Sequence, residues 1–458
     1  MDLDSFVTEL CVTVGDAWQA RPRPGPAPRS ARPPESERRG DPGPGDAMAA
    51  LAQPVASCND ARPRETGVYG HATRPPEWGH TMDQSTRRPW PSRRMALAAV
   101  LATAALMSVV PAAGQAFAVG EGGAVYTMTN ATRAHGGNAV LAFHRGDNGS
   151  LTPAGTFPTG GDGTGAGLGS GHAIAVSKDG RHLAVVNAGS DSLSVFAVRR
   201  QGLALVGGPV PSGGARPTSV TIDRDIVYVL NTGSNSIAGF RLDDERGLEP
   251  IVGSTQALGS GTSVPSQIQF DKRGRVLIVD ERGSSTIDTF VVDDQGVAGP
   301  ARTTPSNAGG PFGFDVDRAG HVLFSAVALA GGLMSGATSY DVAPDGRLTP
   351  NGAPVTSGQA AACWLAAAGR FPYTTNAGSG SIGRFGVAPD GALGLLGTTV
   401  LGAGSHPLDE DVSRDQRWLY VLVDGFHQIV GFQVGSDGEL TRVTSVPVPA
   451  GAAGLGAV

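Results

Sequence analysis

The sequence contains few of the residues on which several large classes of protein depend. Of its 458 residues, three are cysteines and 6% are aromatic. Cys363 is the one cysteine in residues 119–458, so an intramolecular disulfide is excluded there. Because Trp364 and an apolar run surround it, Cys363 is expected to be a small core residue rather than a nucleophile.

Long helical patterns are also scarce. Beyond residue 120, apolar residues rarely recur at helical spacing, whereas short alternating runs are common. The 68 glycines indicate many tight turns. The sequence therefore predicts an all-β protein.

Charge of one sign is not in large excess, since the formal net charge is −6. The first 118 residues contain 13 arginines, no lysine and 12 acidic residues, so the remainder is mildly acidic. A basic face for nucleic acid is not expected. No Cys/His cluster suggests zinc and no loop has calcium-ligand spacing, so neither a metal nor a cofactor is predicted.

The N-terminal region divides into two parts. Residues 1–81 are rich in proline and arginine and are expected to be disordered, or to lie upstream of the true start at Met82 or Met95. Residues 82–118 have a basic start, an apolar stretch and the triplet Ala116-Phe117-Ala118. This pattern is typical of a secretory signal peptide cleaved after Ala118. A secreted or extracytoplasmic protein without a stable membrane anchor is predicted, and we expect a monomer.

Residues 119–458 contain seven copies of one unit, spaced 44 to 57 residues apart. Each copy has an apolar run ending in a polar residue, a Gly/Ser turn, a strand ending in an aromatic residue, and a further turn of the PDGRL type. The run-ending residues are Asn130, Asn187, Asn231, Asp280, Ser325, Asn376 and Asp424. The aromatic residues are Phe143, Phe196, Phe240, Phe290, Tyr340, Phe385 and Phe432.

Four short strands per unit, repeated at this period, predict a seven-bladed β-propeller of antiparallel blades. The body begins at a second strand, GGAVYTMTN, and ends at a link and an inner strand, PAGAAGLGAV. The C-terminal strand is thus expected to join the first blade and close the ring. Within VVNAGSDSLSVF, Asn187 is expected to tie the turn and Gly189 to allow the backbone reversal.

The phrases VYVLNTGSNSIAGF and PDGRL resemble the lactonase family of seven-bladed propellers, which includes propeller-type 6-phosphogluconolactonase and muconate cycloisomerase-like enzymes, and the broader YVTN repeat propellers. The resemblance covers roughly residues 120–458. It implies metal-free opening of a lactone in a central pocket that contains His, Arg and acidic residues. His172 and His406 match the histidines that precede inner strands, and Asp280-Glu281 matches an Asn-Glu pair.

The candidate residues lie where the blades differ. His172, His406 and Glu281 are the catalytic candidates, with either imidazole as a general base. Arg216, Arg282, Asp409 and Glu410 are the ligand-binding candidates. Each has a plainer interpretation: a link histidine bonded to backbone, a surface charge pair at Glu281-Arg282, or solvated acids at Asp409 and Glu410.

Two functions follow as alternatives. One is an exported lactonase-type hydrolase that takes a small ligand or lactone in the central funnel. The other is a noncatalytic extracytoplasmic propeller that binds a small ligand or a protein. The segment GGDGTGAGLGSG (160–171) resembles a nucleotide-binding loop, but a strand follows it and not a helix, so a flexible link is expected. The links and the turns between second and third strands are expected to share the ligand face.

Overall fold

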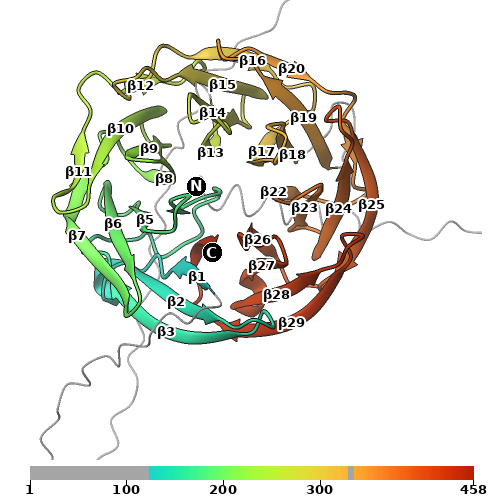
Figure 1. The fold of residues 1–458 in the computed structure, drawn as a ribbon, viewed down its shortest axis with the longest axis horizontal. Coiled ribbons are helices and arrows are strands. Elements are labelled where there is room, and N and C mark those ends of the chain that lie inside the picture. Colours follow the sequence, from blue (N-terminus) through green and yellow to red (C-terminus); the bar gives the residue numbers. More distant parts are fainter. Residues whose placement is uncertain (1–122, 262, 328–334) are drawn as a thin grey trace, which may run out of the picture. The chain divides into compact units, whose positions relative to one another are not determined.

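The computed structural model describes residues 123–261, 263–327 and 335–458, and these form seven antiparallel sheets arranged as a ring (Figure 1). The predicted signal peptide and the segment before it lie outside the described residues. Among the described residues there is no helix whose length and apolar character would let it cross a bilayer.

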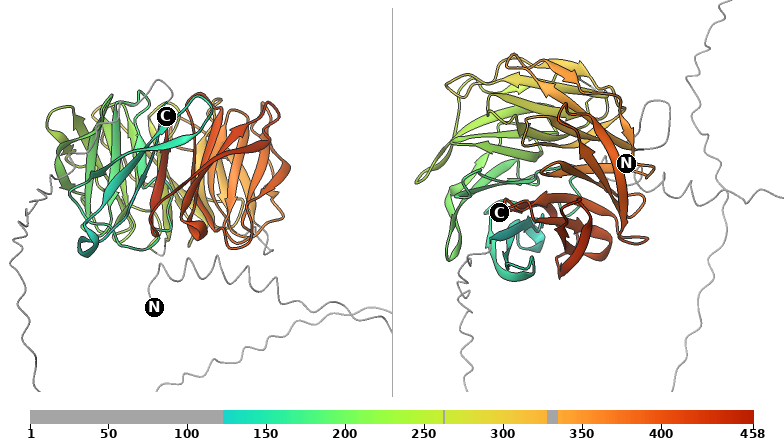
Figure 2. Two further views of the ribbon diagram at one scale, coloured as in Figure 1. Left: turned by 90° about the horizontal axis from the view of Figure 1, so that it is seen from below. Right: turned by 45° about the vertical axis from the view of Figure 1, so that its right-hand side comes forward.

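Each sheet is one blade, and its strands run between the two faces of the ring (Figure 2). From the axis outward, blade 1 comprises β30 (Ala453–Ala457), β1 (Ala124–Met128), β2 (Ala139–Arg145) and β3 (Leu151–Pro158); blade 2 comprises β4 (Ile174–Val176), β5 (His182–Asn187), β6 (Ser192–Arg199) and β7 (Gly202–Pro211); blade 3 comprises β8 (Pro217–Asp223), β9 (Ile226–Asn231), β10 (Ser236–Asp243) and β11 (Gly247–Pro250), with β12 (Gln256–Ala257) also on β10.

The remaining four blades follow the same plan. Blade 4 comprises β13 (Pro265–Phe270), β14 (Val276–Glu281), β15 (Thr286–Val291) and β16 (Arg302–Pro305); blade 5 comprises β17 (Pro311–Val316), β18 (Val322–Ala326), β19 (Gly336–Val342) and β20 (Leu348–Pro350), with β21 (Val355–Thr356) also on β19; blade 6 comprises β22 (Ala362–Ala368), β23 (Phe371–Asn376), β24 (Ser381–Val387) and β25 (Leu393–Val400); blade 7 comprises β26 (Pro407–Val412), β27 (Trp418–Val423), β28 (Gln428–Val434) and β29 (Leu440–Pro447). Two short 3-10 helices, Arg133–His135 and Asp424–Phe426, lie between second and third strands.

The ring closes as the sequence predicts. β30 pairs with β1, with Val125 opposite Ala457 and Met128 opposite Ala453. The backbones of Ala124 and Val458 exchange two hydrogen bonds, of 3.2 and 2.9 Å. The first blade is therefore assembled from both ends of the propeller sequence, and no blade edge is left unpaired at the junction.

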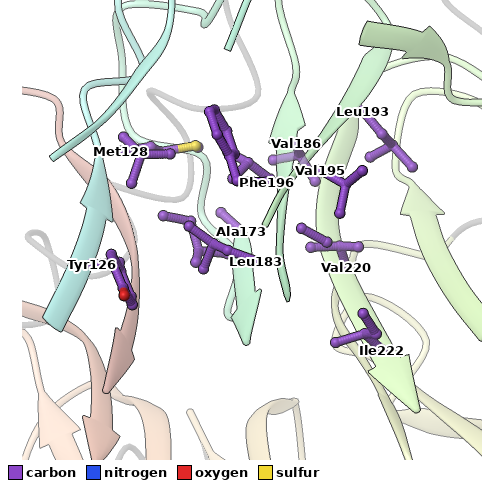
Figure 3. Close-up of a cluster of buried hydrophobic side chains, with 14 of the residues drawn as sticks. Tyr126, Met128, Ala173, Leu183, Val186, Leu193, Val195, Phe196, Val220 and Ile222 are labelled. Atoms are coloured by element: carbon purple, nitrogen blue, oxygen red, sulfur yellow. The ribbon is translucent and has the colours of Figure 1, made fainter. Parts of the chain in front are cut away.

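The core lies between adjacent blades. The second strands are near-continuous apolar runs because both of their faces are covered, and all six residues of β5 are buried. Figure 3 shows Phe196 of β6 among side chains of neighbouring strands, including Met128 and Val220. The seven repeated aromatic residues are all buried, and burial of each such ring contributes about 1.5–3 kcal/mol. Cys363 is buried and free, as expected of a core residue.

The side chain of Asn187 joins a strand of its own blade to the preceding link. Asn187 Nδ2 donates to Ser194 Oγ at 2.9 Å, and Asn187 Oδ1 accepts from Thr159 Oγ1 at 2.7 Å. Gly189 was predicted to allow the backbone reversal of this turn, but the residue with the left-handed backbone is Asp191 (φ 49°). A Cβ on Gly189 would lie 2.1 Å from the Gly163 carbonyl oxygen, so close packing of the link requires glycine here.

The sequence alignment of blades 1, 4, 5 and 7 was wrong by one residue. In blade 1, Val125 pairs with Phe143 as Leu183 pairs with Phe196, so Thr129 and not Asn130 holds the position of Asn187. Glu281 pairs with Thr286 as Asn231 pairs with Ser236, so Glu281 and not Asp280 occupies the position of the repeated asparagine. Similarly, β18 ends at Ala326 and β27 at Val423. The polar letters at Asp280, Ser325 and Asp424 concealed this shift, because each lies beside the true end of its strand.

Candidate functional site

The first strands of all seven blades surround a cavity of about 210 Å³ on the axis of the propeller. His172 lies at one part of its wall, and Lys178 and Arg414, in the turns between first and second strands, lie at another. Asp315 of β17 and Glu410 and Asp411 of β26 also line it. The cavity therefore extends toward the face that bears these turns.

The link before β4 lies across the axis on the other side. Trp364 Nε1 of blade 6 donates to the Ser170 carbonyl at 2.9 Å, and Gly171 N–H donates to the Ser266 carbonyl of blade 4 at 3.1 Å. Ser170 Oγ donates to the Thr218 carbonyl of blade 3 at 2.8 Å. The segment predicted to be a flexible link is thus a link, but it is bonded to three other blades. It occupies the link-side end of the axis, where a ligand funnel was expected.

His172 ends this crossing segment and is the one catalytic candidate that lines the cavity. Its backbone is left-handed (φ 57°), which turns the chain from the link into β4. Burial lowers the pKa of its imidazole to about 4, because a desolvated ring disfavours the charged form. The ring is therefore neutral at neutral pH.

One neighbour approaches the ring of His172 without fixing its proton. Gln267 Nε2 lies 3.4 Å from His172 Nδ1, but it also lies 2.5 Å from the Phe314 carbonyl and 3.2 Å from Gln269 Oε1. The two nearer acceptors can take both amide hydrogens. Nδ1 of His172 is then not obliged to accept one, and a ring nitrogen is left to act as a base.

His406 and Arg216 hold comparable backbone positions but do not line the cavity. Both are left-handed, with φ of 42° and 52°, and each immediately precedes a first strand. The His406 carbonyl accepts from Asp424 N–H at 3.2 Å, and Arg216 N–H donates to Asp191 Oδ1 at 2.6 Å. Of His172, His406 and Arg216, only His172 reaches the cavity.

Glu281 and Arg282 lie away from the cavity lining, at the end of β14. Glu281 is fully buried and accepts from Ser284 Oγ at 3.0 Å, so the surface charge pair considered from sequence is excluded. Burial first, and then the Asp288 carboxyl beside it, raise the pKa of Glu281 to about 8. The guanidinium of Arg282 lies 5.3 Å from the centre of the Phe312 ring, a cation–π arrangement.

Asp409 and Glu410 are buried, which excludes the interpretation of solvated acids. Burial, followed by Asp411, raises the pKa of Asp409 to about 8, and the backbone N–H of His172 is among the groups that oppose this rise. The Asp409 carboxyl therefore lies near the backbone of His172, at the entry to blade 2. Glu410 lines the cavity.

The sequence reasoning missed four cavity residues, namely Asp315, Asp411, Lys178 and Arg414. A signal for two of them was present: TIDRD, QFDKR, DVDRA and DVSRD end four first strands. Thr221, Asp315 and Asp411 occupy equivalent positions in these aligned segments, at the first letter of TIDRD, DVDRA and DVSRD. Each accepts a backbone N–H from the next blade's first strand, that of Phe270, Ala367 or Ala457 respectively.

Known proteins with a similar sequence or fold include lactonase-family propellers. Residues 137–264 match the model of the family described as lactonase, 7-bladed beta-propeller. A periplasmic gluconolactonase of Pseudomonas aeruginosa is similar over 73% of this chain and 99% of its own, with 16% identity and a TM-score of 0.55. A Bacteroides fragilis protein described provisionally as a 6-phosphogluconolactonase is similar over 74% and 98%, with 16% identity and a TM-score of 0.59. No curated protein matches the chain.

Proposed function

We propose that this propeller, which resembles those of the lactonase family, is a hydrolase that opens a small lactone in its central cavity. The observation that carries the proposal is the neutral imidazole of His172 in the wall of a cavity formed by all seven blades. The names of the similar folds support the reaction class, although their identity to this chain is low.

The chemistry asked of His172 is general base catalysis. Water attacks the lactone carbonyl while the imidazole accepts a proton from that water. The imidazolium then returns the proton to the ring oxygen as the carbon–oxygen bond breaks. The product is a hydroxy acid, which releases its carboxyl proton to solvent. A positioned base of this kind contributes about 10²- to 10⁴-fold to the rate.

The two histidines provide a matched test. Asparagine tolerates the left-handed backbone of both positions, so His172→Asn and His406→Asn preserve the local fold while removing each imidazole. On a panel of γ- and δ-lactones, His172→Asn is expected to lose about 10²-fold or more of kcat/KM, and His406→Asn to retain it. Equal losses in the two variants would contradict the assignment.

The pH profile provides a second readout. Since the base form of His172 exists above its pKa of about 4, hydrolysis is expected to rise through pH 4 and to be level toward neutrality. If the purified protein hydrolyses no lactone on the panel, the proposal fails.

A noncatalytic propeller is the second candidate. It is favoured by one observation: Arg216, Glu281, Arg282 and His406 do not line the cavity with His172. Under this alternative the cavity would bind lactones or hydroxy acids with no turnover. Calorimetry in parallel with the hydrolysis assay separates the two candidates.

We also propose that the chain is exported, as residues 82–118 indicate. N-terminal sequencing of the protein from its native host tests this. A mature chain beginning at Val119 is expected, and a chain that retains residues 82–118 would refute cleavage.

A further inference from the structure

The central cavity is electrically polarised along its wall. Its interior contains three carboxyl groups, those of Asp315, Glu410 and Asp411, and its outer part contains the cations Arg414 and Lys178. The Lys178 ammonium group is paired with the buried Asp223 carboxylate at 2.5 Å, so Arg414 is the main positive charge offered to a ligand. Lys178 and Arg414 are exposed, whereas Glu410 is only 2% exposed. A ligand complementary to this wall would place positive charge inward and negative charge outward.

Two of the three carboxyl groups are already bonded within the protein. Asp315 Oδ2 accepts from Ala367 N–H at 3.0 Å, and its Oδ1 accepts from Gln269 Nε2 at 3.1 Å. Asp411 Oδ2 accepts from Ala457 N–H at 2.7 Å. These two aspartates join neighbouring blades, so their presence is explained by the fold.

Glu410 is different, because no hydrogen bond of ordinary geometry reaches either of its carboxyl oxygens within the described residues, although the backbone N–H of Thr375 in β23 lies close enough to oppose the rise in its pKa. A buried carboxyl group that lacks good hydrogen bonds destabilises the fold, and it does so more strongly when it is ionised. Burial first, and then Asp409, raise its pKa well above the ordinary value. Beyond this backbone donor the fold leaves the Glu410 carboxyl group unsatisfied, and a ligand that carries a hydrogen-bond donor would satisfy it.

The surroundings of Glu410 contain several titratable or charged groups. Its own strand contributes Asp409 and Asp411, β17 contributes Asp315, and β23 contributes Tyr373. His172, Lys178 and Arg414 complete the set at the cavity wall. Apart from the backbone N–H of Thr375, the groups that interact electrostatically with the Glu410 carboxyl are acidic or phenolic, which favours a cation beside it.

The kind of cation is limited by size and by coordination. In residues 123–261, 263–327 and 335–458, no group of three or more His, Cys, Asp or Glu side chains could hold a metal ion. The volume of about 210 Å³ lies below the roughly 300 Å³ at which pockets for drug-sized ligands begin. An organic ammonium group on a small molecule fits both limits.

We propose that the cavity recognises a small amino-bearing ligand, whose ammonium group donates to Glu410 and whose carboxyl or lactone group lies toward Arg414 and Lys178. Resting on the proposed function, this identifies the substrate as an α-amino lactone. Hydrolysis of such a lactone yields a zwitterion, with the same inward and outward charges that the cavity wall offers.

The test compares matched ligands on the full chain by isothermal titration calorimetry. The probes are 2-amino-4-hydroxybutanoate and its lactone, and the controls are 4-hydroxybutanoate and γ-butyrolactone, which lack only the amine. The amino compounds are expected to bind about tenfold or more tightly than their controls, the usual worth of a charge-assisted hydrogen bond. Equal affinities would overturn the inference.

Proton release on ligand binding is a second measurement, and it would not be observed if Glu410 had only a structural role. When the ammonium group binds, Glu410 should lose its proton, so the binding heat should differ between buffers of different ionisation enthalpy, and affinity should rise with pH. Glu410→Gln should abolish both effects and weaken the amino ligands about tenfold. A melting temperature equal to or above that of the wild type confirms that this variant is folded.

Glu439→Gln is the matched surface control, since the side chain of Glu439 is 70% exposed and lies on the outer side of blade 7. It is expected to bind as the wild type does, and loss of amine selectivity in this variant too would count against Glu410. Binding of the amino acid without any lactone hydrolysis would refute the enzyme and leave this inference standing. Hydrolysis of lactones with no preference for an amine would support the enzyme and refute this inference.

Discussion

Removal of the last eight residues, Gly451–Val458, should unfold the propeller or bring it close to unfolding. The deletion removes β30, whose Leu455 is 1% exposed, together with the buried Ala452, Ala453 and Ala457. Their burial is worth about 1.5–3 kcal/mol for the leucine and about 0.8 kcal/mol for each methyl group. The lost backbone pairing with β1 and the lost Ala457 N–H donor to Asp411 add about 1 kcal/mol each.

The sum, about 6–7 kcal/mol, is comparable with the total stability of a typical domain. By thermal unfolding followed with circular dichroism, we expect the truncated chain to melt at least about 10 °C lower or to show no cooperative transition. Leu455→Ala alone should cost about 2–5 kcal/mol. Val400→Ala, on an outer strand and 76% exposed, is the control and should change stability by less than about 0.5 kcal/mol. An unchanged melting temperature after the truncation would refute closure of the ring by β30.

Two further predictions concern the buried groups beside the cavity. The pKa of Asp409, about 8, exceeds its unfolded value of about 3.9, so the native state binds the proton more tightly and stability should fall as pH rises from about 4 to 8. Asp409→Asn should flatten this slope and stabilise the protein at pH 8 in urea titrations, and an unchanged slope would contradict the assignment. Trp364→Phe removes the donor to the Ser170 carbonyl, which should cost about 1–3 kcal/mol and speed amide hydrogen exchange at Gly171. Exchange at the wild-type rate would show that this bond does not hold the link.

The fold could be predicted from the sequence because each blade repeats the same local pattern of residues. An apolar second strand, a polar residue at its end and a buried aromatic residue on the third strand recur seven times, and a random match to one copy cannot imitate seven. Even the order of strands in the closing blade could be derived, since GGAVYTMTN and PAGAAGLGAV are the complementary parts of one unit.

The site was harder to derive because it depends on contacts between distant blades. Asp409 and His172 are 237 positions apart, and the association of this carboxyl with the His172 backbone follows from closure of the ring. The link at 160–171 reads as a flexible tract, yet its carbonyl and amide groups are bonded to blades 3, 4 and 6. Glycine-rich sequence gives no sign of these partners, because backbone groups make the bonds.

Glu281 shows a different limit. Its place in the repeat suggested a departure with a chemical purpose, but the carboxyl is buried beside Asp288, and Gly259 N–H donates to Asp288 at 2.6 Å. Blade 4 therefore uses a pair of acids where blade 2 uses Asn187 and Ser194. A residue that breaks a repeat can still serve the blade, and only its surroundings distinguish the two roles.

The central claim is that the cavity on the propeller axis is the ligand site, and a crystal structure with a bound lactone or its hydrolysis product tests it most directly. Crystals of the full chain soaked with 2-amino-4-hydroxybutanoate should show the molecule between His172 and Arg414, with its amine within about 3 Å of a Glu410 oxygen. Density for the ligand on the link face, beside His406 or Arg216, with an empty axial cavity, would contradict the account.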